Sequence, residues 1–230
     1  MGRSFGKYEG VVREVVAKSF LAEFSEDLQE RVLSDALLVD IPSFSTAYRE
    51  YEPARLVFVL TGLLRVCITS REGRQISIAY GSPGKLLGAP ALVGGPVPVR
   101  VQAVKDSAVL VLNTTVIEEV GKSEPGFGWR IAEEVGAEFC DLLVSLGDYA
   151  FDSVPVRTAR HLLSLASPSA ANQKLIACVT QRELAESVGS VREVVWRVLH
   201  KLQDDGMIEI EPEGIVILDH AKLKAMARHV

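Results

Sequence analysis

Several residue types and motifs are scarce in this 230-residue sequence, and each absence removes a class of protein. The three cysteines, Cys67, Cys140 and Cys178, are scattered without C-x-x-C spacing. This pattern argues against a disulfide scaffold or a zinc site and is typical of a reducing cytosol. The longest apolar runs, such as residues 56–64, reach about half of the roughly 20 residues that span a bilayer. No secretion signal is recognisable, so we expect a cytoplasmic protein with no membrane partner.

Catalytic signatures are missing as well. The sequence has no P-loop, no G-x-S-x-G and no H-E-x-x-H motif, and its glycine-dense region, residues 81–95, lacks G-x-G-x-x-G. With 48% hydrophobic and 24% charged residues, the composition is that of an ordinary globular protein of one large or two small domains. We expect neither an enzyme nor a bound metal or cofactor.

The charge is unevenly distributed along the chain. The formal net charge is −5, which argues against general binding of polyanions. Residues 1–155 carry a net charge of −6, whereas residues 156–230 carry +1 together with all four histidines. If a nucleic acid is a partner, we expect it to bind this C-terminal third.

The N-terminal half predicts helices followed by short strands. Apolar residues recur at helical spacing within residues 10–38. Turn residues then separate short apolar segments, and Thr61-Gly62 and residues 71–74 are expected to form hairpin turns. We expect strands at residues 56–60, 63–68, 75–80, 99–104 and 108–112. Closely spaced short strands suggest a small antiparallel barrel or roll.

A long helix is predicted at residues 127–150, with apolar residues at heptad spacing. The seam consists of Ala132, Val135, Phe139, Leu142, Leu146 and Tyr149. About three heptads are near the minimum for a coiled coil and predict pairing with a second copy of the chain. The alternative is a helix lying on its own sheet, whose apolar stripe would look similar. Val154-Pro155 is a helix boundary, and we place a domain boundary there.

The segment after residue 179 predicts two short helices joined by a tight turn. Thr180-x-x-Glu183 and Ser190-x-x-Glu193 both match the capping box that opens a helix. Gly189, between them, tolerates the positive φ of a tight turn. Two helices joined in this way form a helix-turn-helix.

The second of these helices carries polar side chains suited to DNA bases. Arg192 and Arg197 can donate twice to guanine, and Glu193 can accept from the cytosine amino group. Residues 206–218 follow as a β-hairpin, or wing, that turns through Pro212-Glu213-Gly214. The alternative is that the helix pair is only a packing unit and that its charges are solvated.

The order of these parts resembles the cAMP receptor protein/FNR (Crp/Fnr) family of bacterial transcription regulators. The resemblance rests on Glu52-Pro53-Ala54, Leu60-Thr61-Gly62, Glu72-Gly73-Arg74, and above all on Val179–Ala185, Val188-Gly189, Arg192-Glu193 and Arg197. It implies an α+β fold: a cyclic-nucleotide-binding-like antiparallel β-roll at 1–126, a dimerisation helix at 127–153 and a winged helix-turn-helix at 154–230.

The resemblance also implies partners and site residues. Arg192, Glu193 and Arg197 fall where the family reads bases, and Thr180, Gln181 and Ser190 fall at helix starts that hold phosphates. The expected partners are double-stranded DNA with an inverted repeat, a second copy of the chain and, for an activator, RNA polymerase. The competing hypothesis is a ligand-binding or protein-interaction module whose helix-turn-helix is purely structural.

The ligand cassette departs from the family pattern. Relatives that bind cAMP have Gly-Glu-Leu and then Arg-Ser/Thr-Ala, whereas this chain has Gly88-Ala89-Pro90 and an arginine only at Arg100. Leu142 and Leu143 fall where hydroxyl residues bind adenine. A cyclic phosphate buried without a cation would be poorly compensated, so we expect no cAMP binding of the usual kind and leave the small-molecule effector unknown.

Other sensing chemistries also lack their residues. Residues 1–66 contain no cysteine for an iron–sulfur cluster, and no histidine lies in the roll for a haem. A redox switch between Cys67 and Cys140 stays open, although a buried cysteine is most often a small hydrophobic residue.

Overall fold

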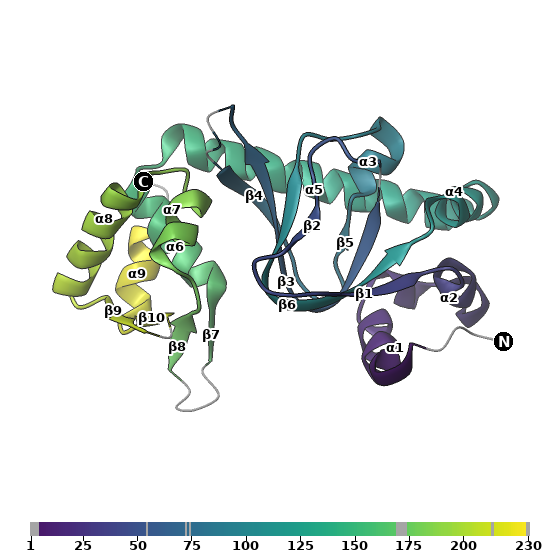
Figure 1. Cartoon of the computed structure of the whole chain (residues 1–230), viewed down its shortest axis with the longest axis horizontal. Helices are drawn as coiled ribbons and strands as arrows, with labels where there is room; N and C mark the ends of the chain where they lie inside the picture. The colour runs from purple at the N-terminus through teal and green to yellow at the C-terminus, as the bar shows by residue number, and fades with distance from the viewer. Residues whose placement is uncertain are drawn as a thin grey trace. The chain divides into compact units, whose positions relative to one another are not determined.

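The computed structural model describes residues 5–53, 55–71, 73, 75–168, 174–212 and 214–228 (Figure 1). Ala54, Glu72, Arg74 and Glu213, which belong to the motifs above, lie outside the described residues. The chain divides into two compact units. The first unit contains Met1–Thr69 and Ile78–Leu142, and the second contains Ser70–Ser77 and Leu143–Val230.

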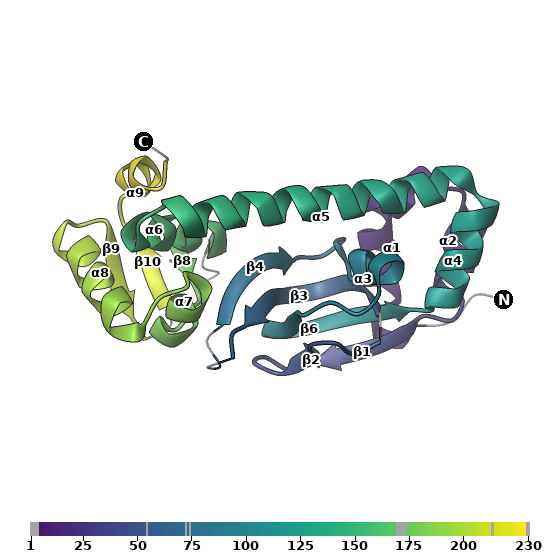
Figure 2. The same cartoon turned by 90° about the horizontal axis from the view of Figure 1, so that it is seen from above.

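The first unit is built around an antiparallel roll. Its strands are β1 (Leu37–Ile41), β2 (Thr46–Tyr48), β3 (Leu56–Thr69), β4 (Gln75–Gly81), β5 (Leu86–Leu87) and β6 (Arg100–Leu112). The main sheet has the order β1-β6-β3-β4, while β2 pairs with β6 and β5 pairs with β3 (Figure 2). The predicted hairpin of β3 and β4 is confirmed, because β3 ends at Thr69 and its neighbour β4 begins at Gln75, although Glu72 and Arg74 of the connection lie outside the described residues.

The predicted hairpin at Thr61-Gly62 is wrong. β3 continues through these residues as one 14-residue strand, and its pairing with β6 shifts register around them. The hydroxyl of Thr61 accepts a 3.1 Å hydrogen bond from the amide of Ala108, which ties the irregularity to the neighbouring strand. Gly62 has φ +89°, and a Cβ there would lie 2.1 Å from Ser107 Oγ. The glycine therefore serves a bulge with close strand contact rather than a turn.

Two further boundaries differ from the prediction. The segments 99–104 and 108–112 form one strand, β6, instead of two. The N-terminal helices also end before residue 38, because β1 begins at Leu37. Helical periodicity shows that helices are present but leaves their ends uncertain by a few residues.

Helices close the roll at one end and along one side. They are α1 (Glu9–Ala17), α2 (Glu26–Leu33), α3 (Ala89–Gly94), α4 (Thr114–Ser123) and α5 (Pro125–Phe151), with short 3₁₀ turns at Gly6–Tyr8 and Phe20–Glu23. Phe127 of α5 is fully buried, and its ring centroid lies 5.5 Å from that of Phe24. Apolar burial of this kind anchors α5 against the N-terminal helices.

The second unit contains residues 70–77, the last part of α5 and a small winged domain. Its elements are α6 (Val154–Leu165), β7 (Ala166–Pro168), β8 (Leu175–Ala177), α7 (Gln181–Ser187), α8 (Arg192–Asp204), β9 (Ile208–Glu211), β10 (Gly214–Ile217) and α9 (His220–Met226). The sheet has the order β7-β8-β10-β9, and all its pairings are antiparallel. In the described part of the chain, every helix is too short or too polar to cross a membrane.

Candidate nucleic-acid interface and ligand cavity

The helix-turn-helix is formed by α7 and α8. The predicted capping box at Thr180 is confirmed: its hydroxyl accepts from the amide of Glu183 at 3.2 Å, and Glu183 Oε2 accepts from the amide of Thr180 at 2.8 Å. Gln181 is the first residue of α7. Gly189 has φ +63° in the turn, as the sequence predicted. Buried leucines and valines then pack the two helices together.

The second predicted capping box is wrong. α8 begins at Arg192, its N-cap is Val191, and no side chain accepts a hydrogen bond there. Ser190 lies one residue before the cap. The turn between α7 and α8 therefore places the apolar side chain of Val191 at the N-cap of α8, a position that usually carries a hydrogen-bond acceptor. The first amide groups of α8 are left without a side-chain cap.

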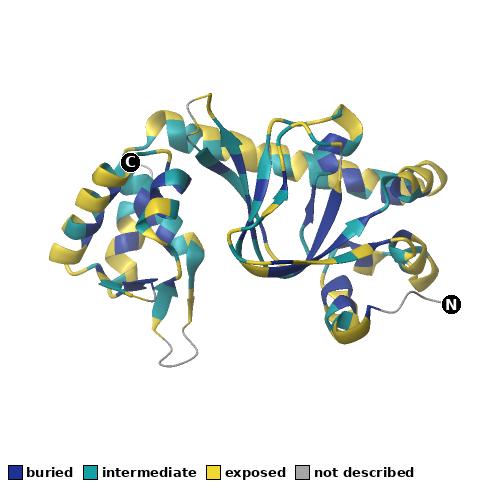
Figure 3. Cartoon of the chain, viewed as in Figure 1, coloured by how far each residue is buried: buried dark blue, intermediate teal, exposed yellow. Residues whose placement is uncertain are grey.

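The outward face of α8 is polar and accessible. Figure 3 shows that α8 carries exposed residues along its length. Arg192, Glu193 and Arg197 are all exposed, and at this spacing they lie along one side of the helix. Arg197 Nε donates to the carbonyl of Glu193 at 3.4 Å. Among the ion pairs of the described residues, none engages these three side chains. Apart from the Arg197 Nε bond to the backbone, their side-chain hydrogen-bonding groups are thus open to a partner.

Trp196 joins this face although it is not among the predicted base readers. It is 48% exposed, and its ring centroid lies 4.0 Å from that of His200. Trp196 therefore adds an exposed apolar ring to the polar face of α8. The i, i+4 spacing of Trp196 and His200 in the sequence was the available signal.

Tyr149, predicted as a seam residue, supports the turn of the helix-turn-helix. Its hydroxyl donates toward the carbonyl oxygens of Ser77 and Ser187 at 2.7 and 2.6 Å. A Cβ added to Gly189 would lie 2.9 Å from its ring. Arg157 lies over the same ring and donates to the carbonyl of Val188. Sequence patterns carry no signal of the hydrogen bonds to Ser77 and Ser187, because these residues lie 72 and 38 positions from Tyr149.

The other seam residues divide between the core and the surface of α5. Val135 packs against the core of the first unit. Ala132 is exposed, and the exposed fractions of Phe139, Leu142 and Leu146 are 58%, 37% and 61%. Part of the stripe therefore covers the chain's own roll, and part presents apolar side chains to solvent.

A cavity of about 340 Å³ lies in the first unit between the roll and α5. Gly88, at the start of α3, lines it with φ +92°, and a Cβ there would lie 2.1 Å from the carbonyl oxygen of Arg55. Ala89 is fully buried. Arg100 is not among the residues that line the cavity, and its guanidinium is bound to Glu50, with Nε–Oε1 at 3.1 Å.

Four charged residues line the mainly apolar cavity, together with Tyr48 and Tyr80: Arg55, Lys85, Glu138 and Asp141. Burial raises the pKa of the Glu138 carboxyl to about 7, against the opposing effect of Lys85. Its Oε1 is buried and has no hydrogen-bond partner among the described residues.

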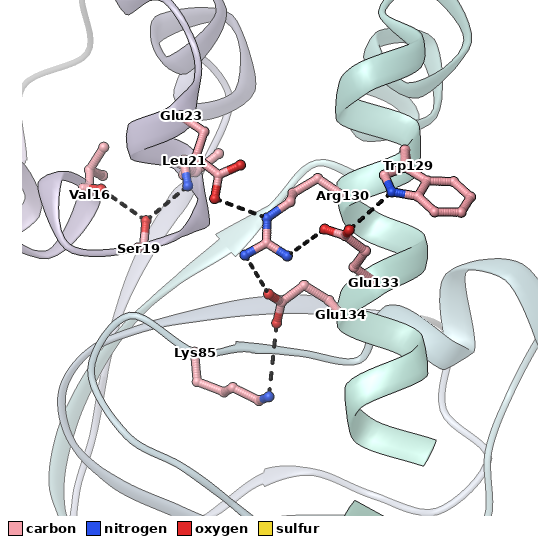
Figure 4. Close-up of polar contacts among 9 residues, drawn as sticks. All are labelled: Val16, Ser19, Leu21, Glu23, Lys85, Trp129, Arg130, Glu133 and Glu134. Carbon is pink, nitrogen blue, oxygen red and sulfur yellow. Dashed lines mark hydrogen bonds and ion pairs between the residues drawn. The ribbon is translucent and has the colours of Figure 1, made fainter. Parts of the chain in front are cut away.

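One helical turn earlier on α5, Glu134 belongs to a network of charges (Figure 4). Glu134 pairs with Lys85 at 3.9 Å and with Arg130 at 3.7 Å. Arg130 also pairs with Glu23 at 3.3 Å and with Glu133 at 2.9 Å. The ammonium of Lys85 is thereby held by Glu134 at the edge of the cavity.

The cysteines are all free. Cys67 is buried in the roll, where its thiol donates to the carbonyl of Arg100 at 3.5 Å, while Cys140 and Cys178 are exposed. A buried thiol bonded to backbone is the environment of a small core residue.

Comparison with known proteins assigns both units. Residues 39–124 match the cyclic nucleotide-binding domain family, and residues 156–226 match the Crp-like helix-turn-helix domain family. The chain belongs to the Crp/Fnr family of transcription regulators. The predicted α+β fold and the expectation of a transcription regulator rather than an enzyme are therefore confirmed.

Individual Crp/Fnr proteins are similar over most of their length. The CRP-like cAMP-activated global transcriptional regulator of Mycobacterium tuberculosis is 24% identical over 196 residues, 83% of this chain and 88% of the relative. The transcriptional regulator LdrP of Thermus thermophilus is 27% identical and covers 79% and 92%. The solved structure of the c-di-GMP-responsive global regulator CLP of Xanthomonas campestris has a TM-score of 0.73 at 22% identity, covering 84% and 99%.

Proposed function

We propose that this Crp/Fnr protein is a dimeric, sequence-specific regulator that binds inverted-repeat DNA. The observation that carries the proposal is the exposed set of Arg192, Glu193 and Arg197 in the first two turns of α8, which form no ion pair with the other described residues. The second helix of a helix-turn-helix enters the major groove near this end. Arg192 and Arg197 would donate to guanine, and Glu193 would accept from cytosine.

Contacts to the DNA backbone would come from the helix starts. Thr180 and Gln181 lie at the start of α7, and Ser190 lies just before α8. Amide groups at helix N-termini favour phosphate oxygens. Such contacts position the protein without reading sequence. A DNA partner implies that the protein works in the cytoplasm, and an activator would also contact RNA polymerase.

Pairing of two chains along α5 would place two recognition helices in successive major grooves. The exposed apolar side chains of Phe139, Leu142 and Leu146 support this role. A two-fold dimer predicts half-sites one helical turn apart. We assign residues 1–126 to the effector-type roll, 127–153 to dimerisation and 154–230 to DNA binding.

The cavity is proposed not to bind cAMP in the usual way. Ala89 offers no carboxylate for a ribose, Arg100 is engaged by Glu50, and Leu142 offers no hydroxyl for adenine. A buried cyclic phosphate would lose charge-assisted hydrogen bonds. Saturable micromolar binding of cAMP in a calorimetric titration would contradict this part of the proposal.

The deciding experiment is selection of a randomised DNA duplex library by the purified protein at moderate salt, without an effector. Enrichment of a two-fold symmetric site would support a regulator that is active without a ligand. If nothing is enriched, repeating the selection with cAMP and with cell extract tests for a missing effector.

The second candidate is a ligand-binding or protein-interaction module with a structural helix-turn-helix. The weak positive charge of residues 156–230 favours it. It predicts no salt-dependent DNA affinity, whereas a DNA-binding protein loses affinity steeply as salt rises.

A further inference from the structure

We propose that the cavity of the first unit binds an apolar small molecule with one hydrogen-bond-donating head group, a hydroxyl or an amine, and that Glu138 accepts this hydrogen bond. The inference rests on the proposed function in one respect, that the cavity is not a cyclic-nucleotide site.

The size and the walls of the cavity define the body of the ligand. Its volume of about 340 Å³ lies within the range of small-molecule sites. Side chains such as Val57, Val66, Val99 and Leu142 line it. Burial of an apolar body against them provides affinity in proportion to the area removed from water.

The Glu138 carboxyl defines the head group. Its Oε1 is buried and unpartnered among the described residues, although the side chain lies against the cavity. A buried acceptor without a donor costs free energy comparable to a lost hydrogen bond. A ligand that supplies one donor recovers this cost, and a ligand without a donor does not.

The surrounding charges favour a donor over an anionic head group. Asp141 is a second acidic residue of the cavity wall, and the ammonium of Lys85 is already paired with Glu134 at 3.9 Å. Arg55 is exposed. Asp141 is exposed as well, so these two opposite charges offset each other. A carboxylate ligand would therefore meet the buried oxygen of Glu138 and, among the described lining residues, no unpaired buried cation. The raised pKa of Glu138, caused chiefly by burial, agrees with a site that disfavours added negative charge.

The test uses three probes with the same tail: decanol, decylamine and decanoate. Calorimetric titration of the full chain at pH 7.5, without DNA, should show decanol or decylamine binding at least about tenfold more tightly than decanoate. Glu138→Leu should reduce that preference to about twofold or less, because one hydrogen bond is worth up to roughly tenfold in affinity. Glu138→Gln should retain decanol binding, because its amide oxygen still accepts.

Two controls keep the result specific. Glu119→Leu changes an exposed glutamate of α4 and should leave the preference intact. Val99→Trp fills the cavity and should abolish binding of every probe. Absence of binding by both decanol and decylamine, or equal binding of all three probes to the unchanged chain, overturns the inference. If the probes bind but the protein enriches no DNA sequence in the selection experiment, the result counts against the proposed function alone. If cAMP displaces decanol, the result counts against the proposal that the cavity is not a cyclic-nucleotide site.

Discussion

The outward face of α8 and the cavity of the roll are both candidate binding surfaces, yet their charged side chains lie in opposite environments. On α8, Arg192, Glu193 and Arg197 are exposed and ready for a polar partner. In the cavity, the Oε1 atom of Glu138 is buried without a donor among the described residues, and Arg100, the arginine closest in sequence to the expected phosphate-binding position, is bound to Glu50. Exposed charges cost little without a partner, whereas a buried one requires compensation. This contrast agrees with the proposal that the α8 face binds DNA and that the cavity does not bind cAMP in the usual way.

The largest expected effect concerns the proposed dimer, which would place two α8 helices on one DNA duplex. Leu146→Asp places a charge on the predicted seam, where the exposed fraction of Leu146 is 61% in the single chain. We expect this variant to sediment as a monomer in sedimentation velocity. Its affinity for a duplex with two half-sites should fall by about 10²–10⁴-fold, because the domain that binds the second half-site is no longer linked to the first.

The matched control for this variant is Val144→Asp. Val144 is equally apolar and 65% exposed on the same helix, but it lies off the seam. This variant should remain dimeric. If the wild type is a monomer, or if both variants have the same oligomeric state, the proposed dimer seam is contradicted.

Removing the base readers tests the α8 face directly. Arg192→Ala and Arg197→Ala should each cost roughly 1–3 kcal/mol at the selected site and relax its sequence preference. Lys224→Ala removes an exposed charge from α9 in the same unit and should leave the preference unchanged. Titrations against matched and mismatched duplexes would detect the difference, and an unaltered preference in both arginine variants would refute the assignment.

The burial of the Glu138 carboxyl in the cavity should make the stability of the protein depend on pH. The pKa of Glu138 is raised on folding from its ordinary value of 4.5 to about 7. The folded state therefore binds more protons than the unfolded state in this interval, and stability is lost as pH rises from about 4.5 to 7. Allowing for partial solvent screening, Glu138→Gln should be about 1–2 kcal/mol more stable than the wild type at pH 8 and similar to it at pH 5.

Denaturant unfolding at the two pH values measures this difference. Glu119→Gln, at an exposed position of α4, serves as the control and should follow the wild type at both. A constant difference between Glu138→Gln and the wild type across this pH range would show that the carboxyl is not held neutral by burial.

The comparison of the two surfaces also explains what the sequence could predict. The Thr180 capping box, the glycine turn and the polar residues of α8 depend on neighbours within a few positions, and local patterns report them well. The bulge at Thr61-Gly62 was mistaken for a turn because its contacts, Ser107 and Ala108, lie on another strand. Ser190 matched a capping box although the helix begins one residue later than that motif requires.

Features that depend on distant pairing could not be predicted in this way. Only the fold brings Arg100 onto Glu50 or leaves Glu138 without a donor. A heptad pattern likewise cannot separate Val135, which packs inward, from Leu146, which is exposed. Apolar periodicity marks which residues avoid water but not what covers them.

The smallest expected effect concerns Tyr149, which supports the α7–α8 turn from outside the recognition face. Tyr149→Phe keeps the ring against Gly189 and removes only the hydroxyl that donates toward Ser77 and Ser187. The loss should be about 1 kcal/mol of unfolding free energy, the usual net value of one hydrogen bond. DNA affinity should fall slightly with unchanged sequence preference, because Tyr149 positions the turn and contacts no base.

The control variant is Tyr51→Phe, at a 70% exposed tyrosine of the first unit. It should leave both the unfolding free energy and the DNA affinity unchanged in thermal unfolding and DNA titration. A changed DNA sequence preference in Tyr149→Phe would mean that the Tyr149 hydroxyl also sets the angle of α8. Equal stability of Tyr149→Phe and Tyr51→Phe would show that this hydroxyl does not stabilise the α7–α8 turn.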